Sequence, residues 1–152
     1  MERYRRFHAA VYYFEYAVGT VRSQEAGLRA REGDGMICGN AIAAYIFMHD
    51  CFVLLEKAVA GISREPELAR KIKRLRKLYE PLGKRVEDIR HALGAHPEGG
   101  EPNTEIATKR SMGGSDGRVW IGKFMLHSRK DLEELRQYME RTGELLHTEW
   151  SV

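Results

Sequence analysis

The sequence predicts an all-α fold, a four- to five-helix up-and-down bundle with a small β-hairpin inserted near residues 104–126. Several long segments carry apolar residues three or four positions apart, as one buried helix face requires. The connections between these segments are short, which favours antiparallel neighbours. With 152 residues, 43% of them hydrophobic, we expect one helical domain over residues 1–152 with a single core.

The N-terminal half contains two predicted helices. Residues 2–31 form the first, and its apolar stripe consists of Phe7, Val11, Phe14, Val18 and Val21. Gly33 to Gly39 are expected to break it. Residues 40–62 form the second helix, with Asn40 as the N-cap. The second and third helices both carry a continuous apolar stripe and are joined by a short connection, so we expect them to pack antiparallel.

A third helix is predicted from Pro66, which suits a first helical position, to Gly94. Its stripe is continuous and consists of Leu68, Ile72, Leu75, Leu78, Leu82, Val86, Ile89 and Leu93. Pro81 lacks a backbone donor and crowds the preceding turn, so we expect a kink or a break between Leu78 and Leu82.

The C-terminal part is predicted to hold a hairpin and a last helix. Val119-Trp120-Ile121 favours a strand, and a glycine-rich turn at 113–117 separates it from residues 104–110. Ser128 with Asp131 resembles a capping box that opens the final helix.

The candidate site lies at residues 87–96, where the third helix ends. Arg90 and His91 emerge beside the apolar stripe, and Pro97 biases His96 toward an extended backbone. Similar Arg-to-His spacings occur at Arg3/His8, Arg85/His91 and Arg141/His147, so spacing alone decides nothing. Only Arg90/His96 combines a polar residue after the arginine, a helix end between the two, and a basic helix leading in.

With these features, Arg90, His91 and His96 resemble the signature of the HEPN superfamily, small helical domains that carry arginine, a polar residue and then histidine. The likeness covers roughly residues 40–97. It implies a metal-independent endoribonuclease acting through the 2′-OH of RNA, a homodimer, and a role in toxin–antitoxin defence or RNA processing with an antitoxin or regulator as partner. Toxin-type members carry a tyrosine two residues after the histidine, where this chain has Glu98.

The resemblance also implies roles for the three residues. Arg90 would neutralise charge on the phosphoryl oxygens, His96 would act as general base or acid, and His91 would orient the phosphate. No cofactor is expected. The histidines lack the i, i+4 spacing or cysteine pairing of a zinc site, which disfavours a metal. The alternative is structural: Arg90 pairs with Glu87 or another carboxylate, and His96 hydrogen-bonds exposed carbonyls at the helix end.

The third predicted helix, which leads into the motif, is basic. From Arg64 to Arg90 the sequence has ten Lys and Arg residues and five acidic residues. The exposed face of this helix could carry RNA phosphates or simply be solvated. This basic face suggests an alternative function for the chain, a catalytically inactive module that binds RNA or a partner protein. The candidate substrate-binding residues are Arg70, Lys71, Lys73, Arg74, Arg76 and Lys77.

His49 and Asp50 interrupt the apolar centre of the second helix. Together with Glu87, they are candidate auxiliary polar residues near the motif, and a solvated face is the alternative.

Cysteine content and hydropathy bear on the compartment. Cys38 and Cys51 are too few for a disulfide framework, and Cys51 sits within an apolar helical pattern typical of a buried thiol. No run approaches about 18 apolar residues. We therefore expect a cytoplasmic protein without a membrane partner.

Overall fold

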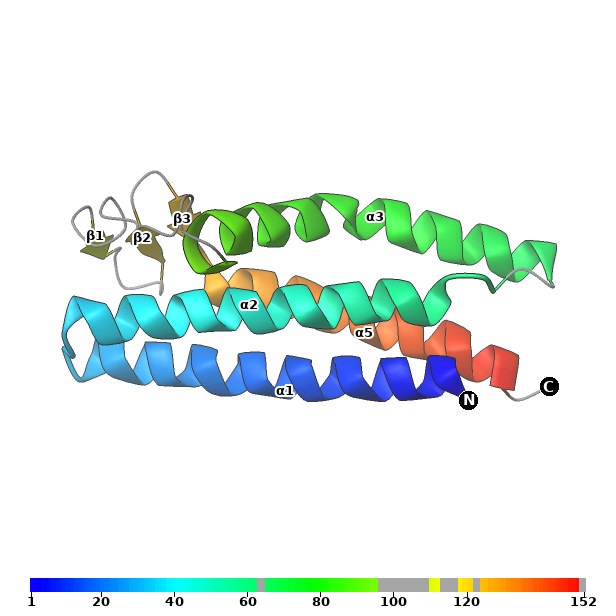
Figure 1. The fold of residues 1–152 in the computed structure, drawn as a ribbon, viewed down its shortest axis with the longest axis horizontal. Coiled ribbons are helices and arrows are strands. Elements are labelled where there is room, and N and C mark those ends of the chain that lie inside the picture. The colour runs from blue at the N-terminus through cyan, green and yellow to red at the C-terminus, as the bar shows by residue number, and fades with distance from the viewer. Residues whose placement is uncertain (63–64, 96–109, 113–117, 122–123, 151–152) are drawn as a thin grey trace.

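The computed structural model describes residues 1–62, 65–95, 110–112, 118–121 and 124–150, with the backbone alone at residues 34, 94–95, 110–112 and 148–150. Within these ranges four α-helices run alternately up and down, and a small antiparallel sheet lies at one end of the bundle (Figure 1). The predicted all-α bundle with a small β element is confirmed.

Helices α1 (Glu2–Arg29) and α2 (Asp34–Val59) form an antiparallel pair with a short turn between them. The predicted start of the second helix at Asn40 is wrong, because α2 already begins at Asp34 and its N-cap is Gly33. The buried side chains of Ile37 and Cys38 explain the early start. Their burial in the core offsets the poor helix propensity of the neighbouring glycines.

Helix α3 (Pro66–Arg90) lies antiparallel to α2, as predicted, and continues through Pro81. Of the predicted kink or break, the break does not occur, since α3 is one helix from Pro66 to Arg90. The apolar stripe also differs at one position, because Tyr79 is buried at 6% exposure while Leu78 is 61% exposed. The continuous buried face of α3 can hold the helix together despite the missing proline donor.

The α-helical part of α3 ends at Arg90, and residues His91–Ala95 form a π-helical turn. The sequence predicts an ordinary α-helix up to Gly94, so the π-helical turn is a difference from the prediction. A π-turn closes hydrogen bonds to the fifth residue instead of the fourth, so it changes the direction in which the following residues leave the helix. The candidate motif therefore sits at a change of helix type.

The small sheet has three strands where a hairpin was predicted. Strands β1 (Arg110–Met112), β2 (Val119–Ile121) and β3 (Phe124–Leu126) pair antiparallel in the order β1-β2-β3. Val119, Ile121 and Leu126 are fully buried, whereas Trp120 is 40% exposed. The sheet therefore closes the end of the core beside the C-terminal end of α3 (Figure 1).

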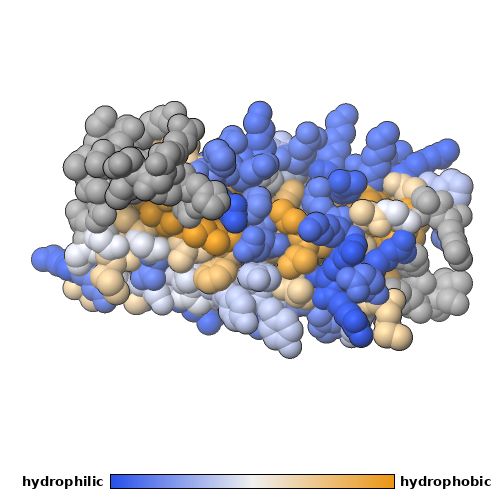
Figure 2. All heavy atoms as spheres, in the orientation of Figure 1, coloured by the Kyte–Doolittle hydropathy of each residue, from blue (hydrophilic) through white to orange (hydrophobic). Residues whose placement is uncertain are grey.

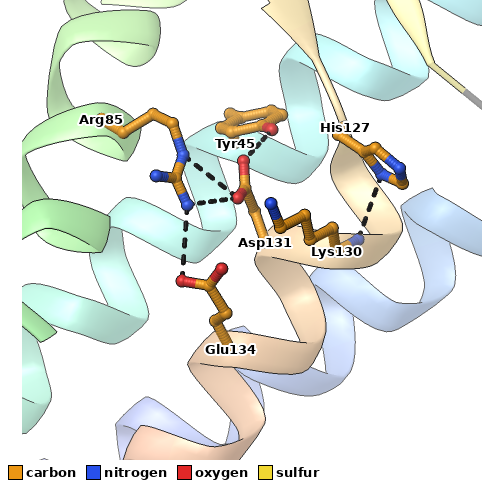
Figure 3. Close-up of polar contacts among 6 residues, drawn as sticks. All are labelled: Tyr45, Arg85, His127, Lys130, Asp131 and Glu134. Carbon is orange, nitrogen blue, oxygen red and sulfur yellow. Dashed lines mark hydrogen bonds and ion pairs between the residues drawn. The ribbon is translucent and has the colours of Figure 1, made fainter.

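Helix α5 (Ser128–Trp150) completes the bundle and contacts α1, α2 and α3. The predicted capping box is wrong. Ser128 Oγ is buried without a hydrogen-bond partner in the described part of the chain, and the Lys130 N–H donates instead to His127 Nδ1, at 3.4 Å. The side chain of Asp131 turns away from its own helix end and toward α2 and α3 (Figure 3).

Helix α2 is the central element, since it contacts the other three helices and the sheet. Its fully buried residues include Tyr45, Met48, Cys51 and Leu55. By length and composition its Gly35–Val59 segment could also cross a membrane, a property that core helices of soluble proteins share.

Candidate functional site at the end of helix α3

Arg90 is the last residue of the α-helical part of α3 and is half-buried. Its Nε atom is buried and has no hydrogen-bond partner in the described part of the chain. A buried N–H without a partner is unfavourable by about 1–3 kcal/mol. Such an unsatisfied donor is unusual in a purely structural arginine and is consistent with a site that receives an anion.

His91 is exposed and lines a groove of about 860 Å³ between α2 and α3. His49 from α2 and Glu87 from α3 line the same groove. The His49 side chain is 19% exposed, and its Nδ1 is buried without a hydrogen-bond partner in the described ranges. Of the auxiliary candidates, the structure thus brings His49 and Glu87 together with His91.

Asp50, the remaining auxiliary candidate, lies beside His49 without lining the groove. Its Oδ1 is 3.7 Å from His49 Nδ1, a distance that suits an ion pair but exceeds hydrogen-bond length. Asp50 therefore contributes charge near the imidazole and does not fix the orientation of its ring.

The rest of the groove's lining is partly apolar and more acidic than basic. It includes Phe52, Val53 and Gly83, two lysines, Lys57 and Lys84, and four carboxylates, which belong to Glu56, Glu80, Glu87 and Asp88. Glu56 is paired with Arg76, and the other three carboxylates would repel a phosphate from the middle of the groove.

In each of the three other Arg/His pairs with a similar spacing, the arginine has a contact elsewhere in the chain. Arg85 bonds Asp131 on α5 while His91 faces the groove with α2, so these two side chains point apart. Arg3 Nη2 donates to the Gly61 carbonyl at 2.8 Å. Arg141 lies over the Tyr79 ring, 5.8 Å from its centroid.

His96 lies outside the described residues, immediately after the π-turn. Its separation from Arg90 therefore stays a prediction. Residues 1–62, 65–95, 110–112, 118–121 and 124–150 contain no group of three or more His, Cys, Asp or Glu side chains placed to hold a metal ion.

The predicted basic face is exposed along its whole length, and Figure 2 shows hydrophilic side chains covering the outer edge of α3. One member is engaged within the chain, because Arg76 Nη2 contacts Glu56 Oε2 at 3.0 Å. That ion pair raises the pKa of the Arg76 guanidinium and links α3 to α2. The other five predicted binding residues, Arg70, Lys71, Lys73, Arg74 and Lys77, are exposed on this helix.

A buried polar network just before the motif was missed by the sequence analysis (Figure 3). Asp131 is 3% exposed and accepts a hydrogen bond from the Tyr45 hydroxyl. Arg85 donates to the same carboxylate, from Nη2 at 2.5 Å and from Nε at 3.1 Å. Arg85 Nη2 also lies 3.5 Å from Glu134 Oε2. The network ties α2, α3 and α5 together about 7.5 Å along α3 from Arg90.

Burial, followed by the charge of Asp131, raises the pKa of the Tyr45 phenol above its usual range, so Tyr45 acts as a neutral donor. The only hint in the sequence was an acid three residues into α5, a pattern that also fits a cap. The partners of Asp131 come from helices far away in the chain, so no local pattern could identify them.

No protein-family model, no curated protein and no solved structure matches this chain.

Proposed function

We propose that the end of α3 binds a phosphate of RNA and that the chain is a metal-independent endoribonuclease of the HEPN type. The main support for this proposal is the buried Nε of Arg90, which has no hydrogen-bond partner in the described residues and lies at the same helix end as His91. A guanidinium suits phosphate, whose oxygens accept two parallel hydrogen bonds from its planar fork.

In the proposed reaction, the ribose 2′ oxygen loses its proton to His96 and forms a bond to phosphorus. The bond from phosphorus to the 5′ oxygen breaks, and that oxygen takes up a proton, which leaves a cyclic 2′,3′-phosphate. Arg90 neutralises the developing charge and His91 orients the phosphate. Histidine suits proton transfer because its unperturbed pKa of about 6.5 keeps both forms available near neutrality.

Cleavage in the presence of EDTA tests this proposal. Purified protein is expected to cut single-stranded RNA and to leave DNA of the same sequence intact, because DNA lacks the 2′-OH. His96→Ala should slow cleavage by about 10²- to 10⁴-fold. His8→Ala is the matched control, since His8 belongs to another Arg-to-His pair and is exposed on α1. Loss of activity on EDTA addition alone would contradict the metal-independent mechanism.

A catalytically inactive module that binds RNA or a partner protein is the second candidate, favoured by the exposed basic face of α3. Wild-type protein that binds RNA in a salt-dependent manner without cutting it, over a range of pH, would replace the enzyme by this module. In that case, substitutions at Lys71 and Lys77 should weaken binding more than His96→Ala.

We also propose that the chain acts as a cytoplasmic homodimer under control of an antitoxin or regulator protein. The support is chemical, because one helix end offers few groups for both proton-transfer steps, and two copies would supply a second set. Light scattering at high micromolar concentration checks the dimer, and a monomer under these conditions would contradict it.

A further inference from the structure

A second cavity, of about 400 Å³, lies on the other side of α3, between α3 and α5. Leu75, Leu78 and Leu145 provide its apolar surface. Lys71 and Arg74 from α3 and Arg141 from α5 surround it, together with one carboxylate, that of Glu144. All three cationic side chains are exposed. Two separate helices therefore direct positive charge at one apolar pocket.

The two sides of α3 differ in charge. The groove toward α2 has four carboxylates and two lysines, whereas the pocket toward α5 has three cations and one carboxylate. A polyanion in contact with α3 is therefore attracted to the α5 side and repelled from the α2 side. Among the cations of α3, Lys71 and Arg74 line the pocket on the α5 side, whereas Lys73 does not.

Arg141 was not among the residues predicted from the sequence. Its guanidinium carbon lies 5.8 Å from the centroid of the Tyr79 ring, a distance that allows a cation–π contact. This contact holds the planar group beside the pocket. Leu78, at 61% exposure, adds an apolar surface against which an unpaired base can pack. The pocket thus combines groups for phosphates with groups for bases.

We propose that the α3/α5 pocket is a subsite for single-stranded RNA, in which Lys71, Arg74 and Arg141 contact phosphates and Leu78 contacts a base. This inference rests on the proposed function and adds the path of the strand to it. Leu78 is twelve residues from Arg90, or about 18 Å along the helix. A strand in the pocket would therefore reach the cleavage site only if it contained several nucleotides.

The test compares an RNA of about twelve nucleotides, within the usual site size of such grooves, with a dinucleotide. Lys71→Gln, Arg74→Gln and Arg141→Gln should each raise the Kd for the long RNA and flatten the salt dependence of log K by about 0.7. These substitutions should raise KM for cleavage of the long RNA much more than they slow cleavage of the dinucleotide, which is too short to span the pocket and the cleavage site. Arg22→Gln, at an exposed position on α1, is the charge-matched control. Circular dichroism and melting curves establish that every variant is folded.

The outcomes separate the subsite from the function. If the long RNA binds and is cut, but the pocket variants behave like Arg22→Gln, the subsite is wrong and the proposed function stands. If wild-type protein neither binds nor cuts RNA, both fail. Polyglutamate serves as a second probe: if it binds wild-type protein and loses affinity in the pocket variants while RNA binding does not change, the pocket receives acidic protein segments and the RNA assignment is overturned.

Discussion

The Tyr45 hydroxyl donates a hydrogen bond to the carboxylate of Asp131, which joins the middle of α2 to the first turn of α5 across 86 positions of sequence. Both residues are buried, and the second oxygen of the carboxylate receives Arg85 from α3. Three helices therefore meet at one ionised group. Because buried charges are stable only when they are paired, the register of these helices depends on this contact.

Tyr45→Phe is expected to lower the free energy of unfolding by about 1.5–3 kcal/mol, since it leaves a buried carboxylate oxygen without its donor. Tyr138→Phe is the matched control. Tyr138 is equally buried, but its hydroxyl has no hydrogen-bond partner in the described ranges, so its loss should be neutral or slightly stabilising. Urea titrations of both variants measure the difference, and equal destabilisation would contradict the assigned role of the hydrogen bond.

Stability is expected to fall as the pH rises above about 8.5–10, the range in which thiols and phenols of the unfolded chain ionise. Burial raises the pKa of Cys51, and burial followed by nearby charges raises the pKa of Tyr45 and Tyr138, so the folded state keeps these protons. The unfolded state then binds fewer protons than the folded state. The free energy of unfolding then falls by about 1.4 kcal/mol per pH unit for each proton by which the two states differ.

Urea titrations between neutral and alkaline pH measure that slope, and tyrosinate absorbance follows the phenols directly. The Tyr45→Phe variant removes one proton from the difference and should show a shallower decline above pH 10. A decline as steep as that of wild-type protein would show that Tyr45 does not contribute.

The helices were predictable because their signal is local. Apolar residues recur every three or four positions, and this gave the four segments and their antiparallel order. The start of α2 was missed because Gly35 and Gly39 are typical of a loop, and only the full burial of Ile37 reveals otherwise. The Tyr45–Asp131 contact could not be predicted, since its members are fixed by the packing of α2, α3 and α5.

The candidate site was predictable in part. The position of Arg90 at a helix end follows from the apolar stripe and Gly94. The orphaned Nε of Arg90 and the shared groove of His49 and His91 depend on how α2 packs on α3. Arg141 was missed for a similar reason, because its place beside Lys71 follows from the packing of α5 on α3.

Gly83→Ala is expected to destabilise the protein by about 1–3 kcal/mol, although alanine favours helices. A Cβ atom at Gly83 would overlap the ring of Phe52 on α2, so α2 and α3 could not approach as closely. Gly19→Ala on α1 is the control, because nothing lies within 4 Å of its added Cβ. It should stabilise the protein by about 0.5–1 kcal/mol. Thermal melts compare the two, and Phe52→Leu in the Gly83→Ala background should recover part of the loss.

Arg90→Met separates a functional arginine from a structural one. Methionine keeps an unbranched apolar stem and removes the buried Nε that lacks a partner, so the free energy of unfolding should stay within about 0.5 kcal/mol of wild type or rise. Arg85→Met is the control: its guanidinium bonds Asp131, and its removal should lower stability by about 1–3 kcal/mol.

RNA cleavage should show the opposite order. Arg90→Met should lose activity and Arg90→Lys should recover little of it, because an ammonium cannot grip two phosphate oxygens as a planar fork does. Arg85→Met should keep measurable activity at temperatures where it is folded. Urea titrations and cleavage rates on the same preparations measure both properties. An Arg90→Met protein that is markedly unstable would assign Arg90 to the structure of the helix end instead of to its chemistry.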